Sequence, residues 1–261
     1  MDKPDFSAVT EITGNNVTSE QIERMFVRYR FAAKFCRDKE VLEVACGSGQ
    51  GLGCLAKAAK KVVGGDIDEK NLQLARDHYR DRRNVELKII DAHCLPFENN
   101  TFDVVLLYEA IYYLKDPQKF MQEAMRVLRK GGVLIICSVN KDWVDFNPSP
   151  YSFAYFSAPK LFELFKSNGF MDITLYGHCV VRNKSLKDKV ISLVKKTAVR
   201  LHVIPNTMKG KEVLKRIFFG KLLPLPPEIT DEMAQYSSPS LISAGTANTS
   251  YKVLFCLGYK Q

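Results

Sequence analysis

Residues 41–51 read Val41-Leu42-Glu43-Val44-Ala45-Cys46-Gly47-Ser48-Gly49-Gln50-Gly51, and this stretch decides the fold. Its first half is an apolar run typical of a buried strand. Its second half is a glycine-rich turn that leads directly into a helical pattern. Such a turn lets a ligand approach the backbone closely and accept hydrogen bonds from its amides. Glycine-rich turns also occur as plain strand–helix connections, so the turn alone leaves both interpretations open.

Short β-rich runs and helical patterns alternate along the rest of the chain. The runs expected to form strands are 41–45, 61–65, 85–90, 102–108, 133–139, 173–181 and 251–259. Helical patterns cover 51–59, 69–79, 117–128 and 159–167, and Thr18 with Gln21 forms the capping box of an earlier helix. Such alternation gives βαβ units and right-handed crossovers. We therefore predict an α/β fold with a doubly wound, mainly parallel, seven-stranded Rossmann-like sheet.

A core and one insertion are expected in this chain. Residues 1–181 and the last strand, within 251–261, form the core, and residues 182–250 form a basic, mainly helical insertion before that strand. Between residues 182 and 221 there are 12 Lys/Arg and 2 Asp/Glu, a local net charge of +10 in a chain of net charge +9. The basic character therefore belongs to the insertion and not to the core.

The cysteines and the apolar segments exclude several classes of protein. Seven cysteines are scattered without a Cys-x-x-Cys pair, which argues against a disulfide framework and a structural zinc site. No apolar stretch approaches the roughly 20 residues of a membrane span. The charged N-terminus argues against a secretory signal. We expect a cytoplasmic protein without a metal site.

Two acidic residues show which kind of ligand the turn would hold. The dinucleotide pattern Gly-x-Gly-x-x-Gly does not fit, because Leu52 or Cys54 stands at its third glycine. Glu43 precedes Gly47 by four residues, and Asp66 follows Gly47 by nineteen at the end of the next expected strand. A carboxylate at that strand end can accept both hydroxyls of a ribose. The pattern favours a nucleoside-containing cofactor other than a dinucleotide.

In these motifs the sequence resembles the class I S-adenosylmethionine-dependent methyltransferases, in particular the small-molecule group that includes the ubiquinone/menaquinone-biosynthesis type. The resemblance covers roughly residues 29–177 and the last strand. Residues 41–49 look like the family's first motif, which binds the methionine end of the cofactor. Asp66 matches the ribose-binding position and Ile67 the residue that packs on adenine. The segment Asp91-Ala92, followed by Leu95-Pro96-Phe97, resembles the one in which an Asp contacts the adenine amino group.

Two further motifs and two departures complete the comparison with that family. Residues 102–105 and 126–133 resemble its fourth-strand and pre-fifth-strand motifs. Ala45 stands where the first glycine is usual, a mild change if Ala45 lies on a strand. Tyr112-Tyr113 replaces a frequent histidine pair. The resemblance implies S-adenosylmethionine as the cofactor, bound by Tyr29, Glu43, Ala45, Gly47, Gly49, Asp66, Ile67, Asp91, Ala92 and Tyr108.

The acceptor side is expected at the carboxyl end of the fourth strand, residues 108–113. Glu109 could orient or deprotonate an amine or hydroxyl, or else contact the cofactor or serve the structure. Tyr113 could stack on an acceptor or simply pack. His178 is the best-placed histidine for a base, with a buried structural role as the alternative. These three residues are the catalytic candidates.

The acceptor class follows from the resemblance and from the charge. We expect O- or N-methylation of a small molecule, such as an anionic or lipid-linked saccharide, with the basic insertion as a lid that attracts it. The same charge would suit an anionic membrane surface. The motifs of DNA methyltransferases are absent, which argues against nucleic acid as the acceptor. A nucleic-acid methyltransferase, a dehydrogenase and a non-catalytic cofactor-binding domain remain the alternatives.

Overall fold

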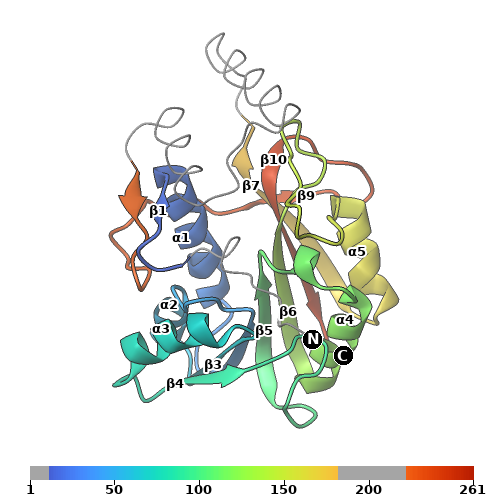
Figure 1. The fold of residues 1–261 in the computed structure, drawn as a ribbon. Helices are drawn as coiled ribbons and strands as arrows, with labels where there is room; N and C mark the ends of the chain where they lie inside the picture. The colour runs from blue at the N-terminus through green and yellow to red at the C-terminus, as the bar shows by residue number, and fades with distance from the viewer. Residues whose placement is uncertain (1–11, 182–221) are drawn as a thin grey trace.

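The computed structural model describes residues 12–181 and 222–261 of the chain. Their centre is an eight-stranded sheet in the order β4-β3-β2-β5-β6-β10-β7-β9 (Figure 1). The five strands from β4 to β6 are parallel, and β10 runs antiparallel to both β6 and β7. The strands are β2 (Glu40–Val44), β3 (Lys61–Asp66), β4 (Val85–Ile89), β5 (Phe102–Tyr108), β6 (Leu128–Val139), β7 (Met171–Val180), β9 (Ser240–Ile242) and β10 (Tyr251–Tyr259).

The doubly wound α/β prediction is confirmed, and all seven expected strands form. The eighth strand, β9, was not predicted, because its three residues lie in a polar segment without strand alternation. It pairs antiparallel with β7 at the edge of the sheet. The strand β6 begins at Leu128, five residues before the expected Val133, because its first part pairs through Phe102 of β5 before a register shift.

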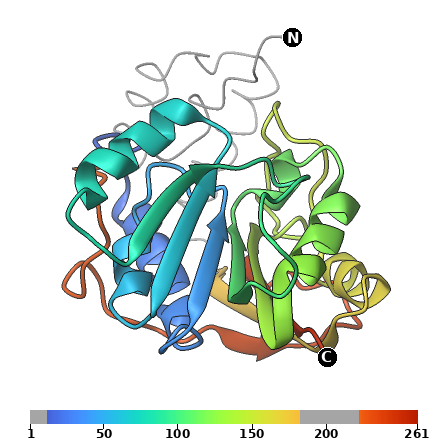
Figure 2. The ribbon, with the colours of Figure 1, turned by 90° about the horizontal axis from the view of Figure 1, so that it is seen from below.

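Helices cover both faces of the sheet. On one face pack α1 (Ser19–Ala33), α2 (Leu52–Ala56) and α3 (Glu69–Tyr79), and on the other pack α4 (Pro117–Val127) and α5 (Ala158–Ser167) (Figure 2). Side chains along each strand alternate between the two layers. In β2, Val41 belongs to the first core and Leu42 to the second. Strands buried on both faces explain why the sequence shows continuous apolar runs.

The ends of the helices follow the sequence signals. The Thr18 hydroxyl accepts from the Gln21 amide, and the Gln21 side chain accepts from the Thr18 amide, so the predicted capping box is present. The side chain of Ser157 caps α5, and Gly169, with φ of +82°, follows that helix. The helix α2 is shorter than predicted and ends at Ala56. It lies immediately after the glycine-rich turn, at the carboxyl end of β2.

The order in which the chain adds strands to the sheet reverses between β2 and β5. From β2 the chain continues outward to β3 and β4, and then returns to place β5 on the other side of β2. The connections on the two sides lead away from each other at this point, which leaves a crevice at the carboxyl ends of the strands. The turn at residues 45–51 therefore lies at the edge of that crevice.

A second, two-stranded sheet joins distant parts of the chain. The strand β1 (Asn16–Val17) pairs antiparallel with β8 (Leu223–Pro224). Residues 182–221 of the predicted basic insertion lie outside the described residues, and with them most of its expected helices. Its described part, 222–250, contains β8 and β9 and no helix. This part was expected to be loop from residue 230 onward.

Candidate functional site

A cavity of about 610 Å³ lies at the carboxyl ends of β2, β3, β4 and β5, with α1 as one of its walls. Its size falls in the range of roughly 300–1,000 Å³ that is usual for small-molecule sites. Ten of the residues predicted from the sequence line it: Tyr29, Ala45, Gly47, Asp66, Ile67, Asp91, Ala92, Tyr108, Glu109 and Tyr113. Three predicted residues are not in its lining: Glu43, Gly49 and His178.

The carboxylate of Asp66 fixes the turn after β2. Its Oδ2 accepts a hydrogen bond of 2.8 Å from the Gly47 amide, and its Oδ1 accepts one of 2.9 Å from the Asp68 amide. Asp66 is 8% exposed, and burial raises its pKa although the backbone hydrogen bonds act in the opposite direction. Each oxygen keeps acceptor capacity toward the cavity that it lines.

The backbone of the glycine-rich turn is left-handed at three positions. Gly47 and Gly49 have φ of 58° and 80°, which glycine adopts without strain. Ala45 has φ of 58° and follows the last residue of β2. The expectation that Ala45 is a mild change on a strand is therefore wrong, because an L-residue in this conformation is strained by about 1–2 kcal/mol. Strained backbone of this kind gathers at ligand sites.

Gly49 is required for packing and does not reach the cavity. A Cβ there would lie 2.9 Å from Cβ of Ala75 and 3.2 Å from the Tyr79 ring, both on α3. The Tyr79 hydroxyl donates to the Gly49 carbonyl at 2.8 Å and accepts from the Gly53 amide at 3.0 Å. The end of α3 thus supports the turn from behind.

Glu43 lies beneath the cavity, where Tyr29 covers it. The Tyr29 hydroxyl donates a hydrogen bond of 2.6 Å to Oε1 of Glu43, which is 1% exposed. Burial raises the pKa of Glu43 to about 8, partly opposed by the bond from Tyr29 and by the charge of Arg28. A Cβ on Gly51 would come within 1.8 Å of the Tyr29 ring, so glycine at this position leaves the space that the ring occupies above Glu43. Glu43 therefore acts on the site through Tyr29.

The next part of the wall carries the residues assigned to adenine. Ile67, directly after Asp66, is 39% exposed although apolar. Asp91 accepts hydrogen bonds from the backbone amide and from Nδ1 of His93, at 2.9 and 2.7 Å. Its partial burial acts to raise its pKa, but the bonds from His93 outweigh that and lower it. His93, to which the sequence assigned no role, lines the cavity beside Asp91.

Glu109 occupies the opposite wall in a strained conformation. Its φ is 52°, directly after β5. Oε2 accepts from the Tyr112 hydroxyl at 2.9 Å and from the Val139 amide at 3.2 Å, and Oε1 lies 3.8 Å from Nη1 of Arg28. Burial, and then the charge of Glu109, raise the pKa of Tyr112 well above its usual value. The carboxylate is held in place from three sides.

His178 is buried and is not in the lining of the cavity. It lies on β7 opposite Val253 of β10, is 8% exposed, and its Nε2 has no hydrogen-bond partner among the described residues. Burial, with a contribution from the charge of Arg24, lowers its pKa. The strand β10 lies between β6 and β7 in the sheet, so the predicted base His178 stands on a strand that is not next to the cavity-lining strands.

Sequence reasoning missed several residues of the cavity, above all Arg24 and Arg28 of α1 and Phe153 in the loop before α5. The capping box predicted the helix α1 but did not indicate which of its residues would line the cavity. Arg28 is 7% exposed, and none of the described residues forms an ion pair or hydrogen bond with the half-buried Arg24. Phe153 is 63% exposed.

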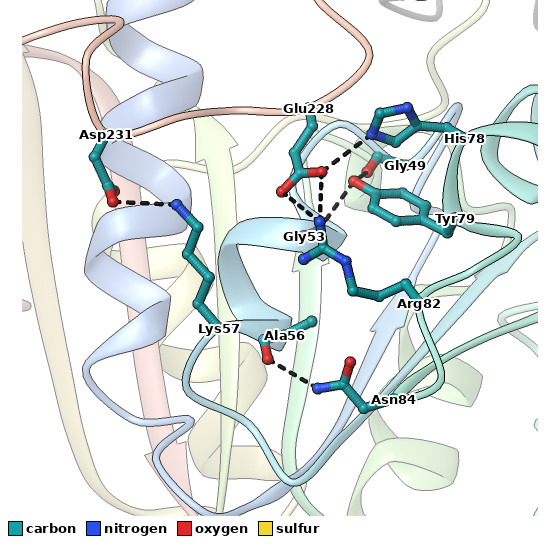
Figure 3. Close-up of polar contacts among 10 residues, drawn as sticks. All are labelled: Gly49, Gly53, Ala56, Lys57, His78, Tyr79, Arg82, Asn84, Glu228 and Asp231. Carbon is teal, nitrogen blue, oxygen red and sulfur yellow. Dashed lines mark hydrogen bonds and ion pairs between the residues drawn. The ribbon is translucent and has the colours of Figure 1, made fainter.

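The segment after β8 backs the turn from the outside. The Ile229 amide donates a 2.8 Å hydrogen bond to the carbonyl of Gln50, which lines the cavity. Glu228 binds Arg82 and His78, and Asp231 binds Lys57 (Figure 3). Asp231 also binds Arg30 of α1. None of the described residues of the insertion, 222–250, is in the lining of the cavity. The described part of the insertion therefore does not form the predicted lid, and residues 182–221 lie outside the described residues.

Within residues 12–181 and 222–261, no helix has both the length and the apolar character of a membrane span. Within the same two ranges there is no group of three or more side chains that could hold a metal ion.

Residues 42–136 match the family model of the methyltransferase domain. A probable S-adenosylmethionine-dependent methyltransferase of Mycolicibacterium smegmatis is 32% identical over 55% of this chain and 56% of its own length. The ubiquinone/menaquinone biosynthesis C-methyltransferase of Idiomarina loihiensis is 33% identical over 49% of this chain and 53% of its own length. The chain thus spans about half the length of these two relatives.

Solved structures share the fold over almost the whole chain. A methyltransferase structure from Thermotoga maritima has a TM-score of 0.54 at 18% identity and covers 93% of this chain and 95% of its own. The [4+2]-cyclase SpnF has a TM-score of 0.58 at 17% identity, over 96% and 87% of the two chains. At these identities the likeness shows the fold alone, and one fold can carry different chemistry.

Proposed function

We propose that this chain is a class I S-adenosylmethionine-dependent methyltransferase, to which its match to the methyltransferase domain and its relatives point, and that it transfers the methyl group of that cofactor to a small-molecule acceptor. One observation carries the proposal. The Gly47 amide and the Asp66 carboxylate meet at one wall of a single cavity, and the fixed carboxylate of Glu109 lies on another. The first wall can bind a nucleoside, and on the second wall Glu109 can accept a proton from the acceptor.

The residues of the first wall fit S-adenosylmethionine. Each oxygen of Asp66 accepts one amide and keeps a lone pair for a ribose hydroxyl. Ile67 offers an exposed apolar side chain beside it for one face of adenine. The carboxylate of Asp91 could accept from the adenine amino group. These roles support the assignment that the sequence motifs imply.

When bound, the cofactor supplies a methyl group made electrophilic by its sulfonium charge. The protein has to hold the acceptor atom in line with that group and to exclude water. Glu109 would orient an acceptor hydroxyl or amine and take its proton, and Tyr112 and the Val139 amide keep its carboxylate fixed. Tyr113 and Phe153 would bound the acceptor on the apolar side.

We propose a small and anionic acceptor, for which a phosphorylated or lipid-linked saccharide is one candidate. The name of the Idiomarina relative points to quinone biosynthesis and so supports a small molecule. The cavity lining carries the cations Arg24, Arg28 and Lys115 and the carboxylates Asp66, Asp91 and Glu109. Arg28 lies 3.8 Å from Glu109, so Arg24 is the cation of α1 that an anionic acceptor would meet. The basic stretch 182–221 adds a net charge of +10 and could also attract an anionic membrane surface. From the scattered cysteines we also propose a cytoplasmic location.

Methyl transfer to nucleic acid and cofactor binding without catalysis are the alternatives. Calorimetric titration with S-adenosylhomocysteine and with NAD tests the cofactor, and transfer of labelled methyl to a panel of small acceptors and to RNA tests the reaction. Binding of S-adenosylhomocysteine with transfer to a small molecule supports the proposal. Binding of NAD alone, or transfer only to RNA, would contradict it.

A further inference from the structure

The geometry points to Glu228 as a positioning residue of the cofactor turn, and we infer that its ion pair with Arg82 sets the affinity for the cofactor. Glu228 lies outside the cavity, in the segment that follows β8 and the basic stretch 182–221. The inference rests on the proposed function, because it assigns the turn at residues 47–51 to cofactor binding. It adds that Glu228, which is far from that turn in the sequence, maintains the conformation of the turn.

Glu228 contacts His78 in the last turn of α3 and forms an ion pair with Arg82, three residues after that helix. Its Oε2 lies 3.0 Å from Nη2 of Arg82 and 3.1 Å from Nε2 of His78, and its Oε1 lies 3.3 Å from the same Arg82 nitrogen (Figure 3). The side chain of Glu228 is only 13% exposed, against 56% for Asp231 three residues later. An ion pair shielded in this way keeps more of its strength than one at the surface.

Two sets of contacts connect the Glu228–Arg82 pair to the turn. The residue after Glu228 donates its amide to the Gln50 carbonyl at 2.8 Å, and its side chain, Ile229, is 1% exposed. On the other side, the guanidinium of Arg82 lies 5.8 Å from the ring centre of Tyr79, whose hydroxyl donates to the Gly49 carbonyl. The Glu228–Arg82 pair thus joins two supports of consecutive carbonyls in the turn.

Gly53 shows how closely the carboxylate sits against α2. A Cβ at Gly53 would lie 2.0 Å from Oε1 of Glu228. The amide of Gly53 donates to the Tyr79 hydroxyl, so the same short helix touches both supports. A side chain at this position would push the Glu228 carboxylate away from where it now contacts Arg82.

The test measures the dissociation constant of S-adenosylhomocysteine by calorimetry at a temperature well below the melting temperature of each variant. Glu228→Gln keeps the shape of the side chain and removes its charge, and we expect the dissociation constant to rise about five- to tenfold. Asp231→Asn is the matched control, because Asp231 is on the same segment and pairs with Lys57 and Arg30 instead. It should lower the melting temperature slightly and leave the dissociation constant within twofold.

Two further variants separate positioning from simple destabilisation. Arg82→Gln should weaken binding as Glu228→Gln does, and the double variant should be no weaker than either, because the two residues act as one unit. Gly53→Ala should also weaken binding, although alanine favours the helix, since its methyl group displaces the carboxylate. An unchanged dissociation constant in Glu228→Gln, or an equal loss in Asp231→Asn, overturns the inference. A wild-type chain that does not bind the probe overturns the proposed function with it.

Discussion

The Gly47 amide donates a 2.8 Å hydrogen bond to Oδ2 of Asp66, so the turn after β2 and the end of β3 are joined at the cavity. These residues are nineteen positions apart in sequence. The bond uses one lone pair of a carboxylate whose remaining capacity faces the place proposed for a ribose. Asp66 therefore serves both the shape of the turn and the recognition of the ligand.

Substitution of Asp66 by alanine tests both roles. Asp66→Ala removes two charge-assisted hydrogen bonds to ribose, each worth about 1.5–3 kcal/mol, and frees the Gly47 amide. We expect the dissociation constant of S-adenosylhomocysteine to rise at least tenfold while the chain stays folded, as followed by calorimetry and circular dichroism. Asp68→Ala is the control, because Asp68 caps α3 from outside the cavity. Equal affinity of Asp66→Ala and wild type would show that the end of β3 does not bind the cofactor.

Glu43 predicts a dependence of stability on pH. Burial raises its pKa to about 8 in the folded chain, against an ordinary value of 4.5. Between these two values the folded chain binds the proton more tightly than the unfolded chain, so the free energy of unfolding falls as the pH rises. The slope is at most about 1.4 kcal/mol per pH unit for one such group. Above pH 8 no further loss comes from Glu43.

The variant Glu43→Gln isolates this effect, because glutamine still accepts the bond from Tyr29 and carries no charge. Its melting temperature should be close to that of the wild type at pH 5 and higher than that of the wild type at pH 8. A chain of this size gains about 2–4 °C for each kcal/mol. A gap that stays constant from pH 5 to pH 8 would mean that Glu43 ionises as it does in the unfolded chain.

Ala45 predicts a gain in stability on substitution. Its φ of 58° is a conformation that glycine adopts freely. Relief of the strain exceeds the extra entropy that glycine loses on folding, so Ala45→Gly should raise the free energy of unfolding by up to about 1 kcal/mol. Urea denaturation measures this. Asp38→Gly, at a φ of 58° outside the cavity, should gain less, because aspartate tolerates the conformation. Loss of stability in Ala45→Gly would contradict the strain.

The sheet could be predicted from the sequence because its strands are buried on both faces and appear as continuous apolar runs. Asp66 followed from its place at the end of one of these runs, nineteen residues after Gly47, whereas Asp91 was predicted from the family resemblance. Arg24 could not be found in this way. It lies in a helix whose orientation against the sheet is set by the packing of residues such as Phe26 and Phe31 with distant strands.

His178 and Glu228 show the same limit from opposite sides. His178 was expected near the site because its strand end resembles the others, but its neighbour in the sheet, β10, comes from the far end of the chain. Glu228 was not singled out because its partners Arg82 and His78 are 146 and 150 residues away. Residue spacing reveals the local periodicity of helices and strands, but it gives no information on contacts between segments that are far apart in the sequence.

Glu109 predicts a separation between turnover and cofactor binding. If its carboxylate orients the acceptor or takes its proton, Glu109→Gln should lower the rate of labelled methyl transfer by about a hundredfold or more. The dissociation constant of S-adenosylhomocysteine should stay within twofold of wild type. Tyr112→Phe removes only the 2.9 Å bond to Oε2 and should have a smaller effect on the rate. Equal losses in rate and affinity would make Glu109 a contact of the cofactor.

Arg24 predicts where the charge of an anionic acceptor is bound. Its guanidinium lines the cavity, and none of the described residues pairs with it, whereas Arg30 on the same helix binds Asp231 outside the cavity. With the acceptor found by the labelled-methyl screen, Arg24→Gln should raise its KM at least fivefold. Arg30→Gln, which removes the same charge from the same helix, should leave KM within twofold.

The salt dependence of KM distinguishes the effect of Arg24 from that of the basic stretch 182–221, which lies outside the described residues. Exposed charges are screened over about 8 Å at physiological ionic strength, whereas a half-buried charge in contact with its ligand is screened less. Neutralising Lys187, Lys189, Lys195 and Lys196 together should therefore flatten the salt dependence of KM, and Arg24→Gln should raise KM at every salt concentration. If Arg24→Gln instead weakens binding of S-adenosylhomocysteine, its charge serves the carboxylate of the cofactor. If neither quantity changes, the acceptor has no anion at this wall.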